Sequence, residues 1–547
     1  MFKDRINKTL SLISDFLYEV AFKKRYYLPL LFITFISYAF SIFNRTVSID
    51  DLAQDLYYGA GDLKIKGLRW GQVLINRIFS TISFTPFLNR FLGVIFLLIT
   101  VVLICSILYY LDNKKNKMFK YTVFSCIFVS YPLINEFFEY YEALTIPLEF
   151  AIVSLCILYL LANEKYDIKN ILLTGLVMSV IMAGYESLIF VYILLVFIIL
   201  YHQYVVNEDK KGWIKEGFGY ALPLFIALVL KFVIGYGLLF ITGLEYEMDG
   251  ASSIGWFNGD IKESIIYTLF NGWYYFLRMF AYKPIMVFVL AMFAYIGIVI
   301  RYQFKSRKSL IIGILLFVVV FALGILQGTK MPYRMAQTVH LFTAYSFFLL
   351  LNEISRKKLG TILCVLLMFM SYRQAVYLHE LLALNNQRSD NEAALIQNIG
   401  YRLYSEFDIS KTVIFCGEYN IGSYIESQIC IEDNTLAGKV EEGVRKILGH
   451  NERPFYNEYV QSDVSSVLNW GLKSFDGQVM IKRYLAYCGY DIKVLEDWPD
   501  KDGESELKLI RHYTDIAEAN DMKPYSIKEF DDYILVYFGP IIEDIGE

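Results

Sequence analysis

Residues 91–111 read FLGVIFLLITVVLICSILYYL and contain no charged side chain. A helix needs about 20 apolar residues to cross the hydrocarbon core of a bilayer, with roughly 17–25 tolerated. Working outward from this run, the sequence predicts eleven membrane spans. They lie near 26–43, 89–111, 119–133, 147–162, 170–184, 188–205, 219–242, 284–301, 309–327, 337–352 and 359–378. No small-residue cleavage site follows the first run, so we expect a retained helix rather than a signal peptide.

The composition indicates a polytopic α-helical membrane protein with an aqueous C-terminal part. Of the 547 residues, 56% are hydrophobic, 17% are aromatic and 19% are charged, which is little charge for a soluble protein. Residues 385–547 carry 30 acidic and 16 basic side chains, whereas the rest of the chain carries 25 and 35. We therefore expect a transmembrane domain at 1–384, with outer loops at 44–88 and 242–283, and a small extracytoplasmic α/β domain at 385–547.

Lysine and arginine gather in alternate loops between the predicted spans. Cytoplasmic loops of membrane proteins carry an excess of these residues. With the N-terminus in the cytoplasm, all five basic loops fall on the cytoplasmic side, at 114–117, 165–169, 210–215, 301–308 and 356–358. An odd number of spans then places the acidic C-terminal domain outside the cytoplasm.

The C-terminal domain shows both helix and strand patterns. Leu395, Ile396, Ile399, Leu403 and Phe407 predict an amphipathic helix opened by Asp390. Residues 412–416 predict a strand closed by Gly417, and residues 532–538 predict a last strand. A helix around 479–487 is expected to end at Gly489, because glycine is common just past a helix end.

Two adjacent carboxylates, Asp50 and Asp51, follow the first span at a predicted outer loop. On one interpretation Asp50 caps a short helix and Asp51 is solvated. On the other, one of them is a general base that accepts the proton of an incoming sugar hydroxyl, while its neighbour holds the acceptor or raises the partner's pKa. In the same loop, Leu68, Val73, Leu74, Ile78 and Ile82 predict a helix lying in the membrane interface.

Further polar and aromatic residues fall at the outer ends of predicted spans. Arg69 and Arg334 could bind a phosphate or merely anchor at the interface. Lys231 falls inside the seventh span, where it faces protein or reaches toward water. Glu142 and Glu186 are candidate site carboxylates or chance surface acids, and Trp70 belongs to an interface belt or a sugar platform.

Neither a metal centre nor a nucleotide-binding fold is indicated by the sequence. The seven cysteines show no CxxC spacing, and the first four, Cys105, Cys126, Cys156 and Cys364, are expected to be small buried side chains. No two of the five histidines have a metal-ligand spacing. A divalent ion is possible, but none of these patterns requires one.

Four segments together resemble the GtrII-type glucosyltransferases, bacterial membrane enzymes of the GT-C class. Asp50-Asp51 followed by Arg69-Trp70 resembles the first outer loop of that family. Residues 131–135 with 140–144 resemble its aromatic and acidic segment, and Pro332-Tyr333-Arg334 resembles its late arginine segment. Gly184-Tyr185-Glu186 resembles its Tyr-Gln corner, with Glu in place of Gln.

The resemblance implies an enzyme of the bacterial plasma membrane that moves a sugar, glucose by its family, from a polyprenyl-phosphate donor to a cell-surface glycan. It implies Asp50 or Asp51 as the base and Arg69 and Arg334 as contacts of the donor phosphate. Trp70, Glu142, Tyr185 and Glu186 would line the acceptor side. The expected partners are these two substrates and the lipid bilayer, with no nucleic acid. A lipid-linked glycan flippase or transporter, and a glycan polymerase, are the alternatives.

Overall fold

The computed structural model describes most of the chain, and the statements below concern its described residues. These are 2–44, 46–47, 52, 61–79, 86–113, 118–139, 143–208, 212–246, 255–258, 261–262, 264–265, 268, 287–303, 307–328, 335–354, 356–419, 467–468, 472, 477–495 and 503–541. The chain forms two compact units. One holds most of the chain up to Leu381, and the other holds Leu382–Glu547 together with Asn44–Gly59 and Glu139–Tyr141.

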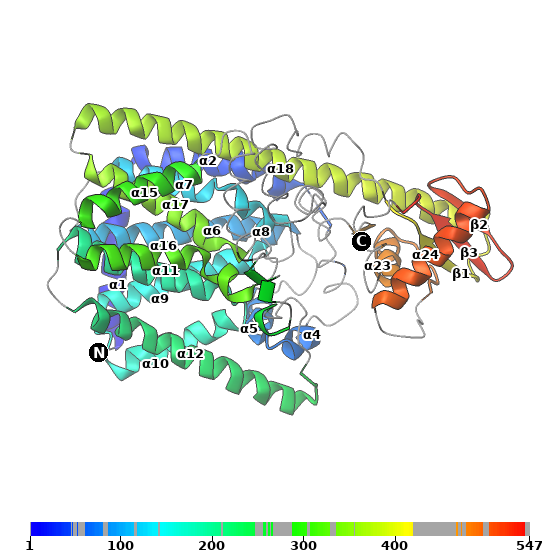
Figure 1. Ribbon diagram of the computed structural model, residues 1–547, viewed down its shortest axis with the longest axis horizontal. Helices are drawn as coiled ribbons and strands as arrows, with labels where there is room; N and C mark the ends of the chain where they lie inside the picture. The colour runs from blue at the N-terminus through cyan, green and yellow to red at the C-terminus, as the bar shows by residue number, and fades with distance from the viewer. Residues whose placement is uncertain are drawn as a thin grey trace. The chain divides into compact units, whose positions relative to one another are not determined.

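The first unit is helical, and most of its long helices run side by side (Figure 1). Its principal helices are α1 (Phe2–Phe16), α2 (Lys24–Phe43), α4 (Gly61–Lys66), α5 (Trp70–Ile78), α6 (Pro86–Leu111), α7 (Met118–Val129), α8 (Asn135–Glu139), α9 (Thr145–Ala162), α10 (Ile168–Met182), α11 (Leu188–Tyr201), α12 (Trp213–Thr242), α13 (Gly255–Asn258), α15 (Val287–Gln303), α16 (Arg307–Gln327), α17 (Gln337–Glu353) and α18 (Lys357–Glu406), which continues into the second unit.

Each of the eleven predicted spans coincides with a helix of the structure. Within the described residues, seven helices are long and apolar enough to cross a membrane, namely α2, α6, α9, α11 with its π-helical extension His202–Val206, α12, α16 and α18. Three further apolar helices, α7, α10 and α15, are shorter. The chain is therefore a largely helical, multi-pass membrane protein. Helix α1, which precedes the first span, was not predicted.

Helices α7, α9 and α17 form the core of the first unit, and most of their residues are buried. Helix α7 packs against α2 and α17, while α9 packs against α6 and α11. The ring of His340 on α17 lies 4.7 Å from that of Phe128 and 5.7 Å from that of Phe150, between ring centroids. Cys105, Cys126 and Cys156 are buried as expected, but Cys364 is half-exposed because its stretch of α18 is largely exposed.

Ion pairs join the helices at the end that carries the basic loops. Arg5 of α1 pairs with Asp167, whose Oδ1 accepts the backbone N–H of Lys169 at the start of α10. Buried Lys120 pairs with Asp112 and also donates to Asn352 at 3.0 Å. A charge at a membrane helix end is tolerated when it meets a partner or water. These pairs fix α1 and α7 against their neighbours at this end.

In the second unit the predicted strands and the glycine-terminated helix are confirmed. Strands β1 (Thr412–Cys416) and β3 (Tyr533–Tyr537) pair in parallel, and β2 (Ser526–Glu529) pairs with β3 in antiparallel, giving the order β1-β3-β2. Helix α23 (Gly477–Tyr487) is followed by Gly489 at φ +95°. Strand β2 and helix α24 (Gly503–Ala519) were not predicted.

The prediction that Asp390 opens a new helix is wrong. Helix α18 runs without interruption through this position to Glu406. The polar side chains around Asp390 find partners without breaking the helix, since Asn386 Nδ2 donates to Asp390 Oδ2 at 2.8 Å and Ser389 Oγ accepts the backbone N–H of Val47 at 3.0 Å. The predicted apolar face is partly confirmed, because Ile396, Ile399 and Leu403 are buried.

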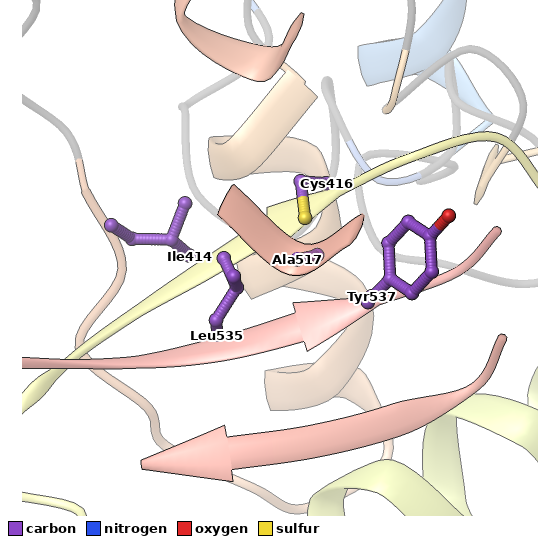
Figure 2. Close-up of a cluster of buried hydrophobic side chains, with 5 residues drawn as sticks. All are labelled: Ile414, Cys416, Ala517, Leu535 and Tyr537. Carbon is purple, nitrogen blue, oxygen red and sulfur yellow. The ribbon is translucent and has the colours of Figure 1, made fainter. Parts of the chain in front are cut away.

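The apolar core of the second unit lies between the sheet and α24. Figure 2 shows Ile414 and Cys416 of β1, Leu535 and Tyr537 of β3, and Ala517 of α24 clustered there. Ile414 pairs in register with Leu535, and Cys416 with Tyr537, so the four strand residues share one face. Burial raises the pKa of the Cys416 thiol to about 12.

Substituting Leu535→Ala is expected to open this core. Deleting a buried leucine side chain typically costs about 2–5 kcal/mol of unfolding free energy. At pH 8 the Cys416 thiol is protonated and buried in the parent, so it should resist a maleimide, whereas Leu535→Ala should make it reactive. Peptide mass spectrometry of the full-length protein measures this, with half-exposed Cys488 as the internal standard. The surface change Lys523→Ala is the control, and equal Cys416 labelling in all three proteins would contradict the packing described here.

Candidate active site

Four of the eight predicted site residues lie within the described chain, and they come from two segments. Arg69 and Trp70 stand at the start of α5, while Tyr185 and Glu186 lie in the turn between α10 and α11. We call residues 183–187 the α10–α11 corner. The other predicted site residues, Asp50, Asp51, Glu142 and Arg334, lie outside the described residues. So does most of residues 261–280 in the outer loop 242–283, whose apolar and aromatic pattern predicts a second interface helix.

A backbone hydrogen bond joins these two segments. The N–H of Gly71 donates to the carbonyl oxygen of Ala183 at 3.1 Å. The first N–H groups and the last carbonyls of a helix have no partner within that helix. Here the N–H of Gly71, the second residue of α5, and the carbonyl of Ala183, which caps the end of α10, satisfy one another. The positive end of the α5 dipole also meets the negative end of the α10 dipole. Arg69 is thereby placed next to the corner that carries Tyr185 and Glu186.

The close approach of α5 to the corner depends on Gly71. A Cβ atom at this position would overlap the backbone carbonyl of Val180. Upstream, the chain enters α5 through a tight turn in which Leu68 has a φ of +58° and Arg69 N–H donates to Lys64 O at 2.6 Å. The Arg69 side chain is half-buried. The backbone conformation of this turn therefore sets the direction in which the Arg69 side chain projects.

Trp70 anchors the same turn to α12. Its indole N–H donates to the carbonyl oxygen of Lys231 at 3.2 Å, and its side chain is 8% exposed. Gly235, one turn further along α12, leaves room for Leu68 and the Trp70 ring. Packing of α5 against the bundle buries most of the Trp70 side chain. The contact of Trp70 with an acceptor sugar stays a prediction.

The side chain of Lys231 turns inward and pairs with the corner. Its ammonium binds the Glu186 carboxylate, whose side chain is 55% exposed, whereas Lys231 itself is 5% exposed. Of the two alternatives for Lys231, the structure thus shows the protein-facing one. Since the Lys231 carbonyl also holds Trp70, one residue of α12 links α5 with the corner.

The structure also reveals a buried acid that sequence reasoning did not single out. Glu149, in the second turn of α9, is fully buried. A Cβ atom on Gly184 of the corner would overlap the Glu149 carboxylate, so the carboxylate lies directly against the corner backbone. An acid in an otherwise apolar membrane segment is costly and usually functional. The sequence does hold a signal for it, because Glu149 is the single Glu within the predicted span 147–162.

Helix α17 completes the surroundings of the corner. Ser187 Oγ donates to Gln337 Oε1 at 2.9 Å, and both side chains are buried. On the α5 side, Gln72 and Asn76 are also buried, whereas Leu74 and Ile78 are exposed, as they would be on a face turned toward lipid. Helices α5, α9, α10, α11, α12 and α17 therefore meet around residues that carry charge or hydrogen-bonding groups.

This arrangement combines cations, carboxylates and neutral hydrogen-bonding groups in a small region. Such a set can bind a phosphate through arginine and hold sugar hydroxyls through carboxylate and amide groups. Among the described residues, no cluster of three or more His, Cys, Asp or Glu side chains could hold a metal ion.

The fold and the site define a polytopic membrane protein with a charged, partly buried site at one end of its helices. The family model described as Glucosyl transferase GtrII matches residues 39–351, more than half of the chain. The chain therefore belongs to the GtrII glucosyltransferase family, as its motifs predicted. It is a membrane glucosyltransferase, with a sugar donor and an acceptor as substrates. No curated protein and no solved structure matches the chain.

Substituting Gly71→Ala is expected to push α5 away from the corner. An extra methyl group in a tight contact typically costs about 1–3 kcal/mol, so the thermal unfolding temperature should fall, and glucosyl transfer should fall with it. Gly237→Ala on α12 is the matched control, because a Cβ there meets nothing within 4 Å and alanine favours a helix. The unfolding temperatures of the parent and of both variants are measured by thermal unfolding in detergent. An unchanged midpoint in Gly71→Ala would contradict the contact with Val180.

Proposed function

We propose that this enzyme moves glucose from a polyprenyl-phosphate donor to a cell-surface glycan on the outer face of the bacterial plasma membrane. The family match over residues 39–351 carries the proposal, because it covers every candidate site residue. The geometry of the corner supports it, since the hydrogen bond from Gly71 to Ala183 joins the segment that carries Arg69 to the segment that carries Glu186. The membrane helices supply an apolar surface for the lipid tail of the donor.

The proposed reaction exchanges one bond at the anomeric carbon of glucose. The acceptor hydroxyl attacks this carbon and forms the new glycosidic bond, while the bond from the carbon to the phosphate oxygen breaks. Asp50 or Asp51 takes the hydroxyl proton, because a sugar alcohol is a poor nucleophile until that proton is accepted. Arg69 and Arg334 stabilise the charge of the departing polyprenyl phosphate. Glu142, Tyr185 and Glu186, with Trp70, line the acceptor side.

Two other activities would use similar residues. A lipid-linked glycan flippase or transporter usually places its polar site near the bilayer midplane, on broken helices of two repeated halves. Here the corner and the start of α5 lie at helix ends, which favours transfer chemistry. A glycan polymerase would share the chemistry and differ in its acceptor. Incubating the purified protein with polyprenyl-phosphate glucose and a glycan acceptor tests the proposal, and loss of the lipid-linked donor is the expected result.

Replacing the proposed base should abolish turnover without unfolding the protein. Asp50→Asn and Asp51→Asn preserve the shape and the capping ability of the side chain. A general base commonly contributes about 10²–10⁴-fold in rate, so at least one variant should lose activity by that factor in kcat. Binding of the lipid donor should change much less. If both variants transfer glucose at the parental rate, the base lies elsewhere and the transporter becomes the better proposal.

The proposed orientation places the C-terminal domain outside the cytoplasm and the N-terminus inside. A cysteine introduced at exposed Lys523 should react in intact cells with a reagent that cannot cross the membrane, and one at exposed Lys8 on α1 should react only after lysis. Labelled peptides are identified by mass spectrometry, which separates the new cysteines from the native ones. Labelling at Lys8→Cys rather than at Lys523→Cys in intact cells would reverse the orientation.

A further inference from the structure

One face of the C-terminal half of α18 is buried, and the first part of that face is polar. Residues three or four apart on a helix lie on the same face. Six residues with this spacing are 8% exposed or less, namely Asn386, Ser389, Glu392, Ile396, Ile399 and Leu403. The last three supply the apolar packing expected of a domain helix. The polar residues need a further reason, because burying a polar side chain is costly unless it is hydrogen-bonded.

Two of these polar side chains accept backbone N–H groups from segments that are distant in the sequence. Ser389 Oγ accepts the N–H of Val47 at 3.0 Å. Glu392 Oε2 accepts the N–H groups of Val467 at 3.0 Å and of Leu468 at 3.5 Å. The polar part of the face therefore holds the backbone of other segments.

The segment that Ser389 holds includes both candidate bases. Residues Asn44–Gly59 belong to the same compact unit as the C-terminal residues. Val47 is 7% exposed and Leu52 is 1% exposed, although both lie in the loop that follows α2. Asp50 and Asp51 stand between them in the sequence, and consecutive Cα atoms are only about 3.8 Å apart. The two buried residues therefore restrict how far either carboxylate can move.

Ser389 is itself tied to the sheet of the second unit. The hydroxyl of Tyr484, a fully buried residue of α23, donates to the carbonyl oxygen of Ser389 at 3.4 Å. On the same helix, Gln478 Nε2 donates to Phe415 O at 2.7 Å, and Gln478 Oε1 accepts the Phe415 N–H at 2.9 Å. Hydrogen bonds thus lead from β1 through α23 and α18 to Val47.

We propose that Ser389 is a positioning residue for glucosyl transfer, because its hydroxyl holds Val47 and so fixes the segment that carries Asp50 and Asp51. This inference rests on the proposed function, in which one of these carboxylates takes the proton of the acceptor hydroxyl. A base must lie within hydrogen-bond reach of that hydroxyl, so loosening its segment lowers kcat more than it weakens donor binding. The C-terminal domain then supports catalysis and is not a separate module of the chain.

Hydrogen–deuterium exchange measures the hold on this segment without any substrate. In the full-length protein in detergent, Ser389→Ala removes the acceptor of the Val47 N–H. Exchange of Val47 should become about tenfold faster, because a buried N–H without an acceptor favours the open state by about that factor. Ser389→Thr keeps the hydroxyl and should restore protection. Peptides that cover β1 are the internal reference and should exchange as in the parent.

Steady-state kinetics distinguishes positioning from support of the fold alone. We expect Ser389→Ala to lower kcat about tenfold with little change in KM for the lipid donor, and Ser389→Thr to recover most of the rate. Ser389→Cys, whose thiol is a weak acceptor, repeats the test if the alanine variant does not fold.

Ser405→Ala is the matched control for both measurements. Ser405 is an exposed serine of the same helix, and its hydroxyl donates to Tyr401 O at 2.9 Å within that helix. This substitution should change neither the exchange of Val47 nor kcat.

Three results would overturn the proposal. Unchanged exchange of Val47 in Ser389→Ala would remove the contact. Faster exchange with an unchanged kcat would limit the contact to a role in folding, and loss of transfer in Asp50→Asn or Asp51→Asn would then leave the proposed function intact. A parental rate in both Asn variants would instead remove the base, and the role of Ser389 with it.

Discussion

The hydrogen bond from Gly71 to Ala183 is the contact on which the candidate site depends. It forms between two helix ends, where backbone groups would otherwise need water or another partner. Because the contact is made by the backbone, it fixes α5 relative to α10 without using any side chain. The side chains make separate contacts, since the Trp70 indole donates to the Lys231 carbonyl and the Glu186 carboxylate pairs with the Lys231 ammonium.

Charged side chains near this contact are placed where their burial is compensated. Lys231 is buried but meets Glu186, and the exposed side of Glu186 keeps part of the pair in a high dielectric. A buried ion pair seldom adds net stability, yet removing one partner is strongly unfavourable. We therefore infer that the pair selects one arrangement of α12 against the corner. The carboxyl group of buried Glu149 lies against Gly184 of the same corner.

The sequence predicted the helices well because each membrane segment carries its own hydrophobic pattern. It also located β1 and the end of α23, where apolar runs stop at Gly417 and Gly489, and it located β3 from the run at 532–538. The helix start at Asp390 was wrong because a polar run resembles a loop until its tertiary partners are known. In the structure, Glu392 accepts the backbone N–H of Val467 at 3.0 Å. A polar residue of this run can therefore belong to α18 and also hydrogen-bond to a neighbouring segment.

The sequence predicted the candidate site as a set of segments but could not predict how those segments meet. Motifs that stand far apart in the sequence predicted Arg69, Tyr185 and Glu186 as candidate site residues. The contact between their segments depends on Gly71, which allows α5 to approach the backbone of Val180, while Gly184 allows the Glu149 carboxylate to approach the corner. No local sequence pattern distinguishes these two glycines from others. Glu149 was missed because it sits in a run that reads only as a membrane span.

The pairing of Lys231 with Glu186 also bears on how the protein is made. A lysine near the middle of a membrane segment opposes insertion by about 2.5–3.5 kcal/mol. Glu186 precedes Lys231 in the chain, so α10, the corner and α11 leave the ribosome before α12. The carboxylate is then already at the membrane when α12 arrives, and α12 can enter the bilayer beside its partner. The order of synthesis thereby lowers the barrier to assembling this part of the enzyme.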